Sequence, residues 1–163
     1  DFVGTDGPGG GRFPSPAALA EAVRACWTAH GDGSGAPYVV FTGGEPLLQL
    51  DEAAIDACHA AGLEVAIETN GTLPIPSGVD WICVSPKPGA QLVVRAGDEL
   101  KLVHPGGVDP VELQSAGLEF DHWYLQPMDG PDKQRNTERA LAYCRAHPRW
   151  RLSLQIHKLL GIA

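Results

Sequence analysis

The sequence predicts an α/β fold with a parallel sheet that is open or partly closed. Short apolar runs, several of them β-branched, alternate along the chain with segments of helical periodicity. The run Tyr38–Phe41 suits a strand that is buried on both faces of such a sheet. Glycine and polar residues come directly after several of these runs, where parallel α/β folds carry their ligand sites.

Two clear helical patterns occupy the first half of the chain. Residues 17–30 repeat apolar side chains at helical spacing, and Ser15 and Pro16 suit the N-cap and the first helical position. A second helix is expected to begin at Asp51 and to end with Gly62 at its C-cap. Both helices flank the strand described above, as in a unit of alternating strands and helices.

The second half of the chain alternates in the same way. Pro74 and Pro76 exclude a full crossover helix between two of its strands. A short helix is expected at 109–116 and a long one near 132–147. No repeat, low-complexity tract or linker divides the chain, so residues 1–163 are expected to form a single domain. Strands are expected at residues 63–68, 81–84, 99–103, 123–125 and 151–155.

Composition narrows the class of protein. The 163 residues are 44% apolar with a net charge of −8, and the lysines and arginines are scattered. Without a basic stripe, direct binding to nucleic acid is not expected. No run approaches the about 18 apolar residues of a membrane span, and no secretory signal is recognisable, so a cytoplasmic protein is expected. The chain begins with Asp1 rather than methionine, and we expect an N-terminal segment to be missing.

The four cysteines lie far apart in the sequence. No CxxC or similar spacing is present that would hold zinc or an iron–sulfur cluster. No metal site is therefore expected within this chain, and the thiols are expected to act as small buried hydrophobic groups. Disulfides are not expected in a cytosolic protein. The cysteines are Cys26, Cys58, Cys83 and Cys144.

Polar motifs follow five of the expected strands. Because parallel strands all point the same way, these motifs are expected to meet at one edge of the sheet and form a ligand site. Each has a simpler explanation alone: Glu68 or Lys87 as a solvated loop end, His157 as a hydrogen-bonded core histidine. The motifs are Thr42-Gly43-Gly44-Glu45, Glu68-Thr69-Asn70, Ser85-Pro86-Lys87, Gln126-Pro127-Met128-Asp129 and Gln155-Ile156-His157-Lys158.

These motifs resemble a known family. The run Thr42-Gly43-Gly44-Glu45-Pro46 resembles the GGEP motif of radical S-adenosylmethionine enzymes, which contacts the methionine part of the cofactor. Together with the other motifs, it resembles the 7-carboxy-7-deazaguanine synthases of queuosine biosynthesis over essentially the whole chain. The resemblance implies a partial parallel β/α barrel, a radical S-adenosylmethionine core with a reduced helix count that here lacks its first strand and cluster loop.

The resemblance also implies a reaction. Members convert 6-carboxy-5,6,7,8-tetrahydropterin to 7-carboxy-7-deazaguanine with loss of ammonia. They use a [4Fe-4S] cluster, S-adenosylmethionine and Mg²⁺, receive an electron from a donor such as flavodoxin or ferredoxin, and form homodimers. The cluster cysteines and the magnesium ligand belong upstream of Asp1, so the chain as written is expected to be inactive.

Site residues carry over by motif, while catalytic residues stay unassigned. The residues expected to bind S-adenosylmethionine are Gly44, Ser85, Pro86, Lys87, Gln126, Pro127, Met128 and Asp129. Those expected to bind the pterin are Thr42, Glu68, Asn70, His157 and Ala163. Three positions depart from the family pattern and bear on the fit of the pterin: Ile156, Leu159 and Ala163, where threonine, an aromatic residue and proline are usual.

Two other functions remain open at this point. One is another radical enzyme, such as an activase that makes glycyl radicals in a protein partner, which would need a large docking surface. The other is a non-catalytic α/β binding module that keeps a cofactor loop after losing its cluster segment. Cysteines with cluster spacing upstream of Asp1 would favour either of the two enzymes over the binding module.

Overall fold

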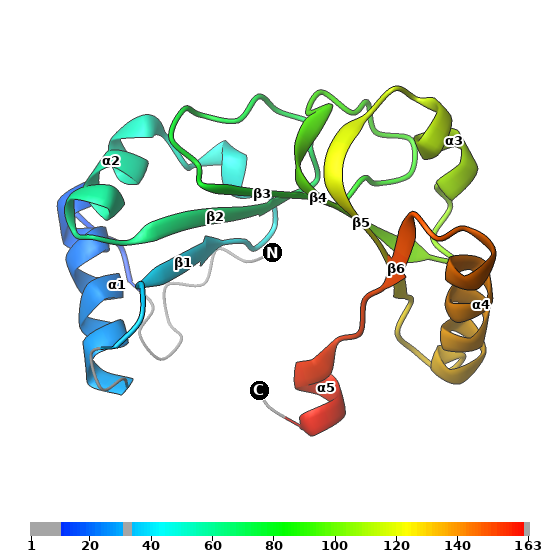
Figure 1. The fold of residues 1–163 in the computed structure, drawn as a ribbon. Helices are drawn as coiled ribbons and strands as arrows, with labels where there is room; N and C mark the ends of the chain where they lie inside the picture. The colour runs from blue at the N-terminus through cyan, green and yellow to red at the C-terminus, as the bar shows by residue number, and fades with distance from the viewer. Residues whose placement is uncertain (1–10, 31–33, 162–163) are drawn as a thin grey trace. The chain divides into compact units, whose positions relative to one another are not determined.

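A computed structural model describes residues 11–30 and 34–161 (Figure 1). The described residues form two compact units. The first unit contains the chain up to Thr69 together with Leu73–Ile82, and the second contains Asn70–Thr72 and the chain from Cys83 onward. The expected single domain is not tested by this division and stays a prediction.

The first unit begins with α1 (Pro16–His30) and β1 (Tyr38–Phe41). The 3-10 helix η1 (Pro46–Leu48), α2 (Glu52–Ala60) and β2 (Glu64–Thr69) follow, and β3 (Trp81–Val84) starts in this unit. The expected N-cap Ser15 is present, and Asp51, where the second helix was expected to begin, is the N-cap of α2. The Ser15 Oγ accepts a hydrogen bond from the Ala18 amide at 3.2 Å, and the Asp51 Oδ1 accepts one from the Ala54 amide at 2.9 Å.

The core of the first unit lies where α1 and α2 pack together and α2 meets β2. β1 and β2 are parallel, with Val40 beside Ala66. Burial of these apolar side chains supplies the main driving force for folding of the unit. The buried members of this core are Ala20, Leu50, Ala54, Ile55, Cys58, Leu63, Val65 and Ile67.

One face of β1 is open, so the expectation of a strand buried on both faces is wrong. Tyr38 is 42% exposed and Val40 is 45% exposed. Val39 and Phe41 instead pack against the core of the unit. Side chains alternate between the two faces of a strand, and among the described residues the core of this unit lies on the face of Val39 and Phe41. Local apolar character could not distinguish the two cases, because it carries no information on what covers each face.

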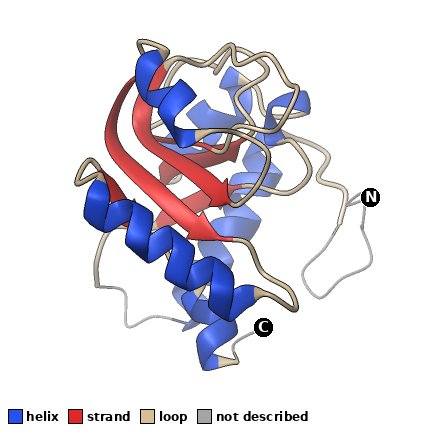
Figure 2. Ribbon diagram, turned by 90° about the vertical axis from the view of Figure 1, so that its right-hand side faces the viewer, coloured by secondary structure: helices blue, strands red, loops and turns tan. Residues whose placement is uncertain are grey.

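The second unit contains the C-terminal end of β3, then β4 (Ala96–His104), α3 (Pro110–Ser115) and β5 (Glu119–Pro127). It ends with α4 (Lys133–Ala146), β6 (Trp150–Leu152) and α5 (Ile156–Leu160). α4 packs against β5 and β6 and lies beside the long strands in Figure 2.

All strand pairs with a described register are parallel, which confirms the expected α/β class. Along the sheet the strands follow the sequence, β1-β2-β3 in the first unit and β3-β4-β5-β6 in the second. In the second unit the core includes Trp123 and Trp150, whose rings meet edge to face at 5.1 Å. No helix within the described ranges is long and apolar enough to cross a membrane.

The C-terminal region differs from the expectation. β6 ends at Leu152, whereas the sequence pattern predicted a strand through residue 155. The Ser153 amide still donates to the Leu125 carbonyl of β5 at 2.9 Å, but the Leu159 amide donates to Gln155 at 3.2 Å. After Ser153, hydrogen bonds within the segment thus replace pairing with β5. The Gln155 to Lys158 motif therefore lies at the start of α5 and not at the end of a strand.

Candidate functional site

The loop after β1 leaves its backbone accessible. Thr42, Gly43 and Gly44 are all exposed, and Gly43 has a φ of 126° that favours glycine. A Cβ added at Gly43 or Gly44 would meet no atom within 4 Å. The absence of side chains here is not required by packing, so it leaves room for a ligand to lie against the backbone.

Glu45 anchors this loop to the end of β2. Its Oε1 accepts hydrogen bonds from the Leu47 amide at 3.1 Å and from the Thr69 hydroxyl at 2.6 Å. Thr69 is 3% exposed, so its buried hydroxyl needs a hydrogen-bond partner, which Glu45 provides. We did not predict this contact, although the alternation of β2 places Thr69 on the buried face with Val65 and Ile67.

In the second unit, Asn70 stabilises its own loop. Its Oδ1 accepts hydrogen bonds from the Thr72 amide at 2.9 Å and the Thr72 hydroxyl at 2.6 Å. Gly71 has a φ of 75°, and an added Cβ would lie 2.7 Å from side-chain atoms of both Leu92 and Val84. The side-chain carbonyl of Asn70 therefore has an internal role, and its predicted contact with substrate stays a prediction.

The motif after β3 forms a small polar group in the second unit. Lys87 donates from its Nζ to the Ser85 Oγ at 2.8 Å. Pro86 is buried between them, while Lys87 is exposed. This hydrogen bond brings a cation and a hydroxyl together, which suits polar and anionic groups of a ligand.

The motif at the end of β5 is connected to both β4 and α5. Gln126 and Pro127 are the last residues of the strand, and the Met128 amide donates to the His104 carbonyl of β4 at 2.9 Å. The Asp129 Oδ2 accepts a hydrogen bond from the Lys158 Nζ of α5 at 2.5 Å. That hydrogen bond, aided by the Gly130 amide and the nearby lysine charges, lowers the pKa of the Asp129 carboxyl.

The remaining predicted residues are placed as follows. Glu68 is exposed in β2 of the first unit, one residue before its end. His157 is exposed in α5 of the second unit, not at a strand end as the sequence suggested. Ala163 lies outside the described residues. Within each unit the motifs lie at the carboxyl ends of strands, α5 excepted, and the convergence of both units on one site stays a prediction.

The predicted absence of a metal site within this chain stays a prediction. Cys26 and Cys58 belong to the first unit, and Cys83 and Cys144 to the second. Burial raises the pKa of the Cys58 and Cys144 thiols, which disfavours the thiolate that a cluster requires. Among residues 11–30 and 34–161, no three His, Cys, Asp or Glu side chains are grouped to hold an ion. The described cysteines thus do not share the loop that a [4Fe-4S] cluster requires.

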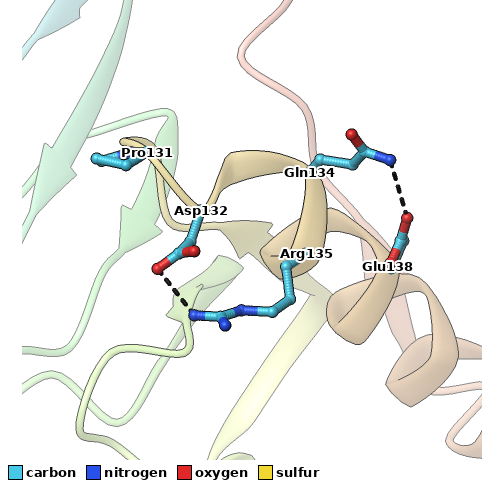
Figure 3. A pocket seen from close by; sticks show the side chains of 5 residues that line it. All are labelled: Pro131, Asp132, Gln134, Arg135 and Glu138. Carbon is cyan, nitrogen blue, oxygen red and sulfur yellow. Dashed lines mark hydrogen bonds and ion pairs between the residues drawn. The ribbon is translucent and has the colours of Figure 1, made fainter.

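A pocket of about 360 Å³ lies elsewhere, at the start of α4 (Figure 3). Asp132 pairs with Arg135 at 2.8 Å, and the Gln134 Nε2 donates to the Glu138 Oε1 at 3.3 Å. These side chains are exposed, and none of them belongs to a predicted motif. Its polar groups pair with each other along one helix, so the pocket is not a candidate active site. The lining residues are Pro131, Asp132, Gln134, Arg135 and Glu138.

Comparison with known proteins identifies the family. No family model matches the chain. A 7-carboxy-7-deazaguanine synthase of Bordetella pertussis is 60% identical over 162 residues, which cover 99% of this chain and 75% of the relative. The chain belongs to the 7-carboxy-7-deazaguanine synthase family. The synthase of Bradyrhizobium diazoefficiens is 57% identical over the same shares of both chains.

Structural comparison agrees with this assignment. The crystal structure of QueE from Escherichia coli matches with a TM-score of 0.60 and 28% identity. The match covers 83% of this chain and 63% of that chain, so this chain spans less than two thirds of the solved protein. The expected resemblance is thereby confirmed, and so is the expectation of an enzyme of the radical S-adenosylmethionine class at the level of the family.

Proposed function

We propose that the protein is a 7-carboxy-7-deazaguanine synthase, which converts 6-carboxy-5,6,7,8-tetrahydropterin to 7-carboxy-7-deazaguanine with loss of ammonia in queuosine biosynthesis. The observation that carries this proposal is the 60% identity to a named synthase over 99% of the chain. We further propose a homodimer in the cytoplasm that receives an electron from a flavodoxin or ferredoxin.

The described loops fit S-adenosylmethionine. Gly44 would let the methionine part lie against the backbone, because no atom occupies the space that a Cβ would take. Ser85 and Lys87 would bind polar groups of the cofactor, and residues 126–129 would contact its nucleoside part. When bound, S-adenosylmethionine supplies the radical chemistry of the family, and the protein contributes orientation and exclusion of water.

The described cysteines do not fit the family's cluster. The family's [4Fe-4S] cluster needs thiolates that share one loop, and these cysteines are divided between two units. We therefore assign no step of the reaction to these four cysteines. No Mg²⁺ ligand is assigned within residues 11–30 and 34–161.

Four described residues are proposed to recognise the pterin. Glu68 offers an exposed carboxylate at the end of β2, which could accept two N–H donors of the pterin ring. His157 could donate to the substrate carboxylate. Thr42 and Asn70 offer smaller polar groups.

Turnover by the complete, cluster-loaded enzyme tests the substrate. Glu68→Gln and His157→Ala are each expected to lower kcat/KM for the pterin about tenfold while leaving S-adenosylmethionine affinity nearly unchanged. Glu64→Gln is the matched control, because Glu64 is also exposed but lies at the opposite end of β2. Normal turnover in both site variants would remove these residues from the site, and no turnover by the wild-type enzyme would refute the proposed reaction.

Anaerobic reconstitution tests the cysteines separately. The 163-residue chain is loaded with iron and sulfide, and both are then assayed per chain. We expect less than one cluster per chain, because the sequence spacing of the four cysteines places no three thiolates in one loop. A stoichiometric [4Fe-4S] cluster on this chain would contradict that expectation without affecting the family assignment.

A further inference from the structure

The inference concerns Asn136, a buried polar residue in α4. Its side chain is 2% exposed, although asparagine favours neither burial nor the interior of a helix. Its Nδ2 donates a hydrogen bond to the Met128 carbonyl at 2.9 Å. A buried amide without a partner would destabilise the fold. The hydrogen bond to Met128 offsets the cost of burying the Asn136 side chain.

The hydrogen bond reaches out of the helix to the loop 126–130. Met128 is held on both sides, because its amide also donates to the His104 carbonyl of β4. Pro127 is buried just before it, and Gly130 turns the chain with a φ of 126° just after it. Asn136 therefore connects the loop to α4, while His104 connects it to β4.

We propose that Asn136 is a positioning residue for S-adenosylmethionine, which acts through the Met128 carbonyl to hold residues 126–129 in the binding conformation. This rests on the proposed function, which assigns these residues to the nucleoside part of the cofactor. A loop that is already ordered before binding loses less conformational entropy when the ligand arrives. Asn136 itself need not touch the cofactor.

A purely structural role is the alternative. Asn136 lies in the first turns of α4, and the N-cap Asp132 makes no side-chain capping hydrogen bond. Asn136 could then stabilise only the start of the helix. The two roles differ in their effect on the loop. If the role is purely structural, replacing Asn136 should change the loop no more than another substitution in the same turn of α4 does.

The test compares Asn136→Leu with Thr137→Val. The first removes the donor to Met128, while the second removes a hydrogen bond to Lys133 that stays within α4. Amide exchange of residues 126–130 is measured without any ligand, and affinity for S-adenosylmethionine by calorimetry. We expect about tenfold faster exchange and about tenfold weaker binding for Asn136→Leu only. Thr137→Val should stay close to wild type in both measurements.

Two further variants keep the test decisive. Asn136→Gln retains an amide donor and is expected to recover most of the affinity. Asn136→Ala removes the donor without adding volume, and it replaces Asn136→Leu if the leucine variant does not fold. Steady-state kinetics should show a raised KM for S-adenosylmethionine with kcat and the KM for pterin nearly unchanged.

Failure of this inference can be distinguished from failure of the proposed function. Gln126→Ala and Asp129→Ala test the loop directly. If they weaken cofactor binding and the Asn136 variants do not, the positioning role is refuted while the proposed function stands. If neither the loop variants nor the Asn136 variants change affinity, the assignment of the loop to the cofactor is refuted as well.

Discussion

Two loops that look alike in sequence differ in what their glycines do. In the loop after β1, Gly44 faces open space, with no atom within 4 Å of an added Cβ. In the loop after β2, an added Cβ at Gly71 would lie 2.7 Å from Leu92 and Val84. The same residue type after a strand thus leaves room for a ligand in one case and permits close packing in the other.

The loop after β5 adds a contrast in rigidity. Its Met128 is held by Asn136 and His104, and its Asp129 is held by Lys158. The glycine pair after β1 is exposed, and the Glu45 side chain anchors its loop. We infer that one loop offers bare backbone to the cofactor and that the other offers a preformed surface.

The largest effect is expected for Gly71→Ala. Strain at a φ of 75° and overlap with Leu92 and Val84 should together lower the free energy of unfolding by about 3 kcal/mol. Urea denaturation measures the loss. Gly89→Ala is the matched control, because Gly89 has a φ of 72° but open space around its Cβ. It should lose only about 1 kcal/mol from strain, and equal losses would contradict the packing role of Gly71.

Gly44→Val is expected to weaken cofactor binding while leaving stability nearly unchanged, the opposite of Gly71→Ala. Its side chain would enter the space proposed for the cofactor, so affinity for S-adenosylmethionine should fall at least about tenfold. The free energy of unfolding should change by less than about 1 kcal/mol, because an added Cβ at Gly44 meets no protein atom within 4 Å. Calorimetry and urea denaturation of the same variant provide the comparison. Unchanged affinity would mean that this loop does not bind the cofactor. The affinity of Gly44→Ala for S-adenosylmethionine should lie between those of Gly44→Val and the wild type.

Thr69→Val tests the anchor between β2 and the loop after β1. The substitution keeps the shape and removes the hydroxyl that donates to Glu45. Because Thr69 is buried, we expect a loss of about 1–2 kcal/mol in the free energy of unfolding. Thr72→Val should have a smaller effect, since Thr72 is half-buried and its amide keeps the hydrogen bond to Asn70. An equal or larger effect of Thr72→Val would contradict this ranking.

The smallest effect on stability is expected for Lys158→Met. The pKa of Asp129, which the Lys158 hydrogen bond lowers, should rise toward the ordinary value of about 3.9. A lowered carboxyl pKa stabilises the folded state at pH values above the ordinary pKa. This stabilisation is lost as the pH falls through the lowered pKa. Carboxyl NMR titration measures the shift. Lys133→Met should change it less, because its Nζ lies 3.7 Å from the carboxylate; a larger change would contradict the assignment to Lys158.

The sequence by itself determined the class of fold, most elements and the family. Periodicity and caps are local properties, so β3 was predicted with its observed bounds, and the helices beginning near Ser15 and Asp51 were found within a residue or two. The glycine and proline motifs were specific enough to indicate a 7-carboxy-7-deazaguanine synthase, which the relatives confirm.

Only the tertiary structure decided what those local patterns contact. β4 and β5 extend to nine residues each because they pair with each other, although Gly97 and Asp98 have low strand propensity. The open face of β1 and the switch from strand to α5 likewise depend on which neighbours are present. The hydrogen bonds from Thr69 to Glu45 and from Asn136 to Met128 join residues from different elements. A sequence pattern specifies which groups need partners, but chain folding selects the partner, because contacts between elements depend on packing that local periodicity does not encode.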